Sequence, residues 1–185
     1  QRGALLFRGL PIHSDQDFDL VMQNLDQKNF SYAESLSNAV RQNRTDRVFT
    51  ANEAPPEVEI YFHHEMAQTP IFPSKLAFYC EQAPRKGGAT PLCRSDALLA
   101  EMTRREPEFV KRCDELGLCY TNVMPVSADL ASGQGRSWRS TLSVDTKEEA
   151  ATRLAELGYE LEWLPDDSLK AKTPTLPAIR RLPDG

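Results

Sequence analysis

The sequence has 185 residues, 40% hydrophobic and 26% charged, which is typical of one globular domain with a sizeable core. A formal net charge of -5 argues against nucleic acid or an anionic membrane surface as the main partner, and no apolar run approaches the roughly 18 residues of a membrane span. The four cysteines show no Cys-x-x-Cys spacing, so we expect reduced thiols, a cytoplasmic location and no cysteine-ligated zinc site.

A strand and a helix are predicted before residue 28. The apolar run 4–7 predicts a short buried strand. A helix follows, because Ser14 stands three residues before Asp17, which is the spacing of a capped N-terminus. The inner face of this helix is predicted from apolar residues at helical spacing: Phe18, Val21, Met22 and Leu25.

The stretch 28–47 is polar and shows little periodicity, so we interpret it as a loop. Its arginines, Arg41, Arg44 and Arg47, favour a solvated surface over a role in a site. Asn52 precedes a pair of prolines that forces an extended turn before the next element. Two interpretations of Asn52 stay open: it faces a site, or it bonds the backbone of its own turn.

Chemistry is expected at His63, His64 and Glu65, because two of the three histidines in the chain stand here beside a carboxylate. The apolar residues 60–62 predict a strand, in which His63 and Glu65 share one face and His64 points away. Such a pair, joined by a second imidazole, makes the two-histidine, one-carboxylate triad of non-haem Fe(II) oxygenases. His13 is the only other imidazole, but its place at a helix entrance favours a surface role.

A structural alternative exists for the same tripeptide. Both imidazoles can bond backbone or water at a strand edge, with Glu65 simply solvated, and the tripeptide by itself favours this interpretation. The choice between the two interpretations therefore depends on the surrounding sequence.

Further strands are predicted at 76–80, which is nearly all apolar, and at 118–120 and 159–164. The Gly87-Gly88 pair predicts a turn, because adjacent glycines permit backbone angles closed to other residues. The phosphate-binding Gly-x-Gly-x-x-Gly pattern is absent from the sequence, so nucleotide binding is not predicted.

Three more helices are predicted in the second half of the chain, the first two of them most simply packing helices. One begins at Ser95 or Asp96, which are alternative caps. The next has Pro107 in its first turn and stops at Gly117. The last spans 146–157 and opens on a Thr-x-x-Glu capping box.

Several of these segments together resemble the taurine dioxygenase (TauD/TfdA) family, and most closely its clavaminate synthase-like branch. They are 3–9, 47–53, 62–67, 73–76, 78–80 and 87–91. Gly135, Arg136 and Trp138 are similar to the family's Gly-Arg-x-Trp turn. Arg139 and Leu142 stand where related proteins often have Gln and Phe, which puts a carried-over substrate role of this turn in doubt.

The resemblance implies a single oxygenase domain over 1–185, mixed α/β with a mostly β core. Its fold would be a double-stranded β-helix, or jelly roll, with flanking helices and a strand at 176–179. It implies Fe(II) as cofactor, held by His63 and Glu65 as catalytic metal ligands, and 2-oxoglutarate as co-substrate. Thr90 matches the threonine of the family's Gly-Gly-x-Thr motif, whose hydroxyl bonds a 2-oxoglutarate carboxylate. Asn52 is assigned, together with Thr90, as a cofactor-binding residue.

The implied reaction is the oxidation, by default hydroxylation, of an unidentified small molecule by dioxygen, with 2-oxoglutarate converted to succinate. The partners are then small molecules, with a homo-oligomer left open. In the family the distal metal histidine and the arginine that pairs with 2-oxoglutarate lie on later strands. We therefore expect this chain to be the N-terminal and central part of a longer enzyme, with its jelly roll incomplete at the C-terminus.

Two alternatives remain beside the oxygenase. One is a non-catalytic chain, either a truncated relative or a binding module that keeps the fold without turnover. The other, weaker one is a zinc-dependent hydrolase that uses the same two ligands.

Overall fold

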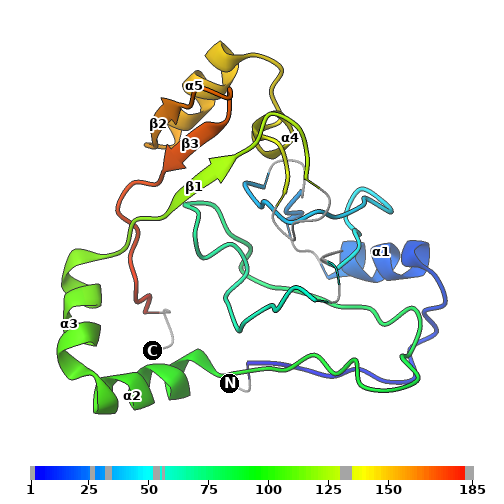
Figure 1. The fold of residues 1–185 in the computed structure, drawn as a ribbon. Helices are drawn as coiled ribbons and strands as arrows, with labels where there is room; N and C mark the ends of the chain where they lie inside the picture. The colour runs from blue at the N-terminus through cyan, green and yellow to red at the C-terminus, as the bar shows by residue number, and fades with distance from the viewer. Residues whose placement is uncertain are drawn as a thin grey trace.

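The computed structural model describes residues 3–25, 28–31, 35–51, 55, 57–129 and 135–181. Figure 1 shows α4, α5 and the strands gathered at one end of the molecule, α1 on another side, and α2 and α3 meeting at a sharp angle. The elements are α1 (Asp15–Asn24), α2 (Ser95–Arg105), α3 (Pro107–Leu116), β1 (Thr121–Met124), α4 (Trp138–Leu142), α5 (Lys147–Glu156), β2 (Glu160–Trp163) and β3 (Leu169–Lys172).

The sheet of the described residues is antiparallel in the order β1-β3-β2, so the last strand in the chain lies in the middle. In β3, Leu169 and Ala171 are buried, and the lysines between and after them face outward. Lys170 and Lys172 pair with glutamates of β2 at 2.8 and 3.1 Å. This two-residue alternation gives the sheet one face toward the core and one toward solvent.

The core lies between this sheet and helices α4 and α5. Trp138, at the start of α4, is 1% exposed, and its ring meets that of Trp163 edge-on with centroids 5.1 Å apart. The segment between α1 and α2 adds Leu36 and Met66 to the same cluster. The other buried members are Met124, Leu142, Ala150, Leu154, Leu169 and Ala171.

Helix α5 confirms the prediction for 146–157. The Thr146 hydroxyl accepts the backbone N–H of Glu149, whose carboxylate in turn accepts the N–H of Thr146, as in a capping box. Ala150 and Leu154, four residues apart, are buried on one face. Gly158, with φ 76°, adopts the left-handed conformation expected just after the helix.

The other predicted helices are present with small differences. Ser14 caps α1 by accepting from the Asp17 N–H at 3.1 Å. Helix α3 begins at Pro107 and ends at Leu116, and Gly117, whose φ is 69°, caps it. The predicted cap of α2 is wrong, because Ser95 is the first helical residue. Arg94 occupies the N-cap position, where its side chain bonds Asp96 and makes no capping hydrogen bond.

Several predicted strands are wrong. Residues 4–7 and 76–80 have no strand conformation, and in the first of these segments Leu5 and Leu6 are 78% and 77% exposed. A strand requires a neighbour that accepts and donates its backbone hydrogen bonds, and no neighbour pairs with these segments within the described residues. Leu118 and Leu176 make only an isolated bridge, so 176–179 is not a strand, and β1 starts three residues after Leu118.

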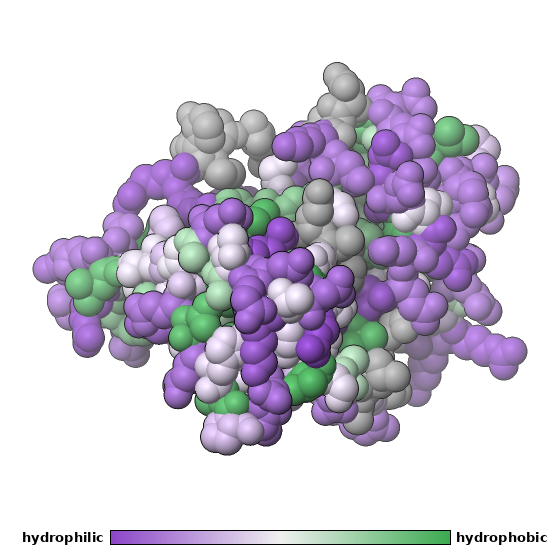
Figure 2. All heavy atoms as spheres, turned by 90° about the horizontal axis from the view of Figure 1, so that it is seen from above, coloured by the Kyte–Doolittle hydropathy of each residue, from purple (hydrophilic) through white to green (hydrophobic). Residues whose placement is uncertain are grey.

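The described residues are therefore mixed α/β, as expected, but their core is not mostly β. Helices α4 and α5 supply as much of it as the small sheet does. Hydrophilic side chains dominate the face seen in Figure 2, with hydrophobic ones scattered among them. The four cysteines are free thiols; Cys113 is half-buried and the other three are exposed, so none of them is a core residue.

Within the part of the chain that the structure describes, no helix has both the length and the apolar character needed to cross a membrane.

Candidate functional site

The His63-His64-Glu65 motif lies at a turn and not in the predicted strand. The carbonyl of His64 accepts the N–H of Ala67 at 3.2 Å, which closes a β-turn. Met66, inside this turn, has φ 58°, a conformation that is uncommon outside glycine. The Met66 side chain is buried in the core cluster, and this burial offsets the strain and fixes the turn in place.

His63 and Glu65 face each other across the start of this turn. Nδ1 of His63 lies 2.7 Å from the carbonyl oxygen of Tyr61. Since a carbonyl only accepts, Nδ1 carries the proton, and a neutral ring keeps its lone pair on Nε2. Nε2 in turn lies 4.0 Å from Oε2 of Glu65.

This arrangement fits a cation. Two acceptor atoms that face each other at 4.0 Å are stabilised by a positive charge between them, and an imidazole nitrogen with a carboxylate oxygen is a donor set of non-haem iron. The Nδ1–H to carbonyl bond is also the kind of outer contact that orients metal-binding histidines.

Arg41 is a contact of this site that the sequence did not predict. Its Nη2 donates to Oε1 of Glu65 at 3.1 Å, and the two side chains are only 13% and 20% exposed. The prediction that Arg41 forms solvated surface is therefore wrong. The two residues are 24 positions apart, so no local pattern could have revealed the pair.

The motif is tied to helix α2 through its second histidine. Nε2 of His64 lies 2.5 Å from Oγ of Ser95. Thr90 stands five residues before Ser95, in a stretch whose residues are all exposed, and no hydrogen bond within the described residues joins it to His63 or Glu65. Asn52 lies outside the described residues.

The third imidazole of the chain has a different role. His13 is exposed at the entrance of α1, where its backbone N–H donates to Oδ2 of Asp17 at 3.0 Å. This bond, helped by the Ser14 hydroxyl, holds the pKa of Asp17 below its ordinary value of 3.8. Among the described residues no three histidine, cysteine, aspartate or glutamate side chains come together in a group that could hold a metal ion.

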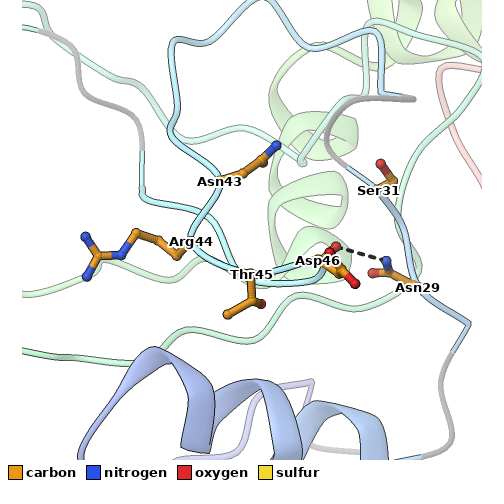
Figure 3. A pocket seen from close by; sticks show the side chains of 6 residues that line it. All are labelled: Asn29, Ser31, Asn43, Arg44, Thr45 and Asp46. Atoms are coloured by element: carbon orange, nitrogen blue, oxygen red, sulfur yellow. Dashed lines mark hydrogen bonds between the residues drawn. The ribbon is translucent and has the colours of Figure 1, made fainter.

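A polar hollow of about 530 Å³ lies near the loop that carries Arg41, and Figure 3 shows its lining. Nδ2 of Asn29 donates to the Asp46 carbonyl at 3.2 Å, and the Arg44 side chain extends away from the other lining residues. The hollow is lined by Asn29, Ser31, Asn43, Arg44, Thr45 and Asp46. It contains none of the predicted site residues and lacks the apolar walls typical of small-molecule sites.

Comparison with known proteins gives this geometry a family context. Residues 1–163 match the family described as taurine catabolism dioxygenase TauD, TfdA family. A clavaminate synthase-like protein of Arabidopsis thaliana is 43% identical over 180 residues, which cover 97% of this chain and 54% of that protein. The dapdiamide synthesis protein DdaC of Enterobacter agglomerans is 30% identical over 170 residues, covering 92% of this chain and 48% of its own length. The chain thus spans about half the length of these relatives. It belongs to the TauD/TfdA family.

Proposed function

We propose that this chain is part of an Fe(II)/2-oxoglutarate-dependent dioxygenase that oxidises, by default hydroxylates, a small molecule. The observation that carries the proposal is the facing pair of Nε2 of His63 and Oε2 of Glu65, 4.0 Å apart. Family membership supports it, because the family is described as dioxygenases. The Enterobacter relative, named as a synthesis protein, supports a small-molecule substrate.

Each residue of the pair has a defined part. His63 offers the Nε2 lone pair, and the Tyr61 carbonyl holds the ring through the Nδ1–H. Glu65 offers Oε2 and supplies negative charge that favours a divalent cation. Fe(II), when bound, supplies the redox chemistry by which dioxygen and 2-oxoglutarate are consumed.

Thr90 and Asn52 are the residues we assign to 2-oxoglutarate. The Thr90 hydroxyl would donate to a carboxylate of the co-substrate. The bond between His64 and Ser95 supports this assignment, because it holds the start of α2, five residues after Thr90, against the metal-binding turn. We also propose a single domain over 1–185 that forms part of a double-stranded β-helix, with the second metal histidine outside this chain.

The decisive experiment is an anaerobic Fe(II) titration in the presence of 2-oxoglutarate, on this chain and on its longest natural form. The metal-to-ligand charge-transfer band is recorded, and calorimetry gives the dissociation constant. We expect His63→Ala and Glu65→Ala to lose the band and to weaken Fe(II) binding at least about 100-fold, beyond the cost of losing an outer-sphere contact. His13→Ala, the matched histidine control, should leave both unchanged.

A band that survives both ligand substitutions would contradict the assignment of the ligands. No band in any form would contradict the oxygenase and favour a binding module. Turnover that continues without dioxygen and 2-oxoglutarate would instead support a zinc-dependent hydrolase.

A further inference from the structure

The two oxygens of the Glu65 carboxylate have different neighbours. Oε1 accepts a hydrogen bond from Nη2 of Arg41 at 3.1 Å, while Oε2 faces Nε2 of His63 at 4.0 Å. A carboxylate can rotate about its last bond and exchange its oxygens, but the Arg41 contact opposes that rotation. Oε2 therefore stays directed toward His63.

This ion pair is shielded more than an ordinary surface pair. Exposed pairs contribute little because water and salt weaken them and because both side chains lose freedom. Here the Arg41 side chain is 13% exposed and its guanidinium lies 5.4 Å from the centre of the Phe49 ring. The Phe49 ring already restricts the Arg41 side chain, so forming the ion pair with Glu65 costs less side-chain freedom.

The backbone that presents Arg41 is held by the core. Leu36 packs in the same cluster as Met66, so the segments that carry Arg41 and Glu65 are both joined to it. Nη1 of Arg136 donates to the Ser37 carbonyl at 2.9 Å, which ties this segment to the turn before α4. Arg41 therefore reaches Glu65 from a fixed position.

We propose that Arg41 is a positioning residue for the metal site: it holds Oε1 of Glu65 so that Oε2 alone is presented toward His63. This inference rests on the proposed function, because it takes Glu65 as a metal ligand. It adds a residue that acts through Glu65 and makes no contact with the metal itself. Its effect is on how tightly the metal is held and on the electronic surroundings of the ion.

The test compares Arg41→Gln, Arg41→Lys and Arg44→Gln in the same anaerobic Fe(II) titration. Arg44 is the matched control, since it lies on the same loop but pairs with Asp15, at 2.9 Å, and not with Glu65. We expect Arg41→Gln to raise the Fe(II) dissociation constant about 10- to 100-fold, the usual cost of losing an outer contact of a ligand. Arg41→Lys keeps the charge without the planar fork and should recover part of the affinity.

The charge-transfer band separates positioning from a merely structural role. Arg41→Gln should shift or broaden the band at saturating Fe(II), while a structural ion pair would lower the denaturation midpoint and leave band and dissociation constant unchanged. That second outcome overturns the inference. If Arg41→Gln fails to fold, Arg41→Lys decides: a dissociation constant and band equal to those of the unaltered protein overturn the inference.

The Fe(II) titrations distinguish failure of this inference from failure of the proposed function. If the unaltered protein binds Fe(II) and needs both His63 and Glu65, but not Arg41, only the inference is wrong. If the unaltered protein binds no Fe(II), or binds it equally after His63→Ala, the proposed function is wrong and the inference fails with it.

Discussion

Nε2 of His64 lies 2.5 Å from Oγ of Ser95, so the turn that carries Glu65 is joined directly to the first residue of α2. Adjacent histidines thus have separate partners. His63 faces Glu65 and the Tyr61 carbonyl, whereas His64 joins two segments that are 31 residues apart. His63 is therefore the candidate metal ligand, and His64 is a structural link.

The two histidines should consequently respond differently to substitution. We expect His64→Ala to leave the Fe(II) dissociation constant within about threefold, while the chain before α2 becomes more accessible to protease. A typical intramolecular hydrogen bond contributes about 0.5–1.5 kcal/mol, so the loss of stability should stay in that range. Limited proteolysis and metal titration of His64→Ala, Ser95→Ala and the double variant measure this. A double variant as stable as either single one shows the link, whereas fully additive effects would contradict it.

Trp138 should be one of the residues on which folding most depends. Trp138→Ala removes a side chain that is 1% exposed and packed edge-on against Trp163, so the free energy of unfolding should fall by about 3–5 kcal/mol. Urea denaturation measures the change. Leu98→Ala, on the half-exposed face of α2, is the control and should stay within about 0.5 kcal/mol. Equal effects of the two substitutions would show that the core is not where the structure places it.

Gly117 should tolerate no side chain. Its φ of 69° is a conformation that L-residues avoid, and a Cβ there would lie 2.6 Å from the Leu176 carbonyl oxygen. Gly117→Ala should lower the free energy of unfolding by about 2 kcal/mol or more. Gly87 is the matched control: it has the same φ but no atom within 4 Å of its Cβ position, so Gly87→Ala should show only the backbone cost of about 1 kcal/mol. Equal costs at the two positions would contradict the predicted clash.

The N-terminus of α5 should lose stability in acid. Backbone N–H groups of Asp145 and Thr146 donate to the Glu149 carboxylate at 2.9 and 3.0 Å and hold its pKa below the ordinary 4.5. Because the pKa of Glu149 is lower in the folded protein, the ionised carboxylate stabilises the fold above pH 4.5. This stabilisation is lost as the pH falls through the folded-state pKa. The difference in denaturation midpoint between Glu149→Gln and the unaltered protein should therefore be largest near pH 7 and should shrink below pH 4.5.

Glu148→Gln is the control for that experiment, because it removes the same charge from the same helical turn. Comparing the two variants separates the loss of the capping bonds of Glu149 from the loss of a charge in the first turn. A difference between Glu149→Gln and the unaltered protein that stays constant from pH 7 to pH 3 would contradict the role of the capping carboxylate.

Local signals were enough to predict α1, α2, α3 and α5, but the short helix α4 was not predicted. Thr146 and Glu149 predict the start of α5, and Pro107 and Gly117 predict the two ends of α3. These signals are local because helix caps and stops act through bonds between near neighbours in the sequence. Residues 4–7 illustrate the opposite case. Their composition favours a strand, but a strand exists only when another segment pairs with it, and composition contains no information on that partner.

The candidate site, too, was only partly predictable from the sequence. The spacing of His63 and Glu65 was visible in the sequence, and the two side chains do face each other, although a turn and not a strand brings this about. Arg41 was assigned to solvent because it stands among other charged residues. Its position beside Glu65 results from the packing of Leu36 and Met66 into one core, which is a property of the folded chain.

The central place of β3 in its sheet has a consequence for synthesis on the ribosome. β1 and β2 are both translated before the strand that hydrogen-bonds to them. Until Lys172 has left the exit tunnel, neither outer strand has its partner, and Trp138 has no completed sheet to pack against. The sheet, and the core that packs on it, can therefore be completed only after β3 has been synthesised.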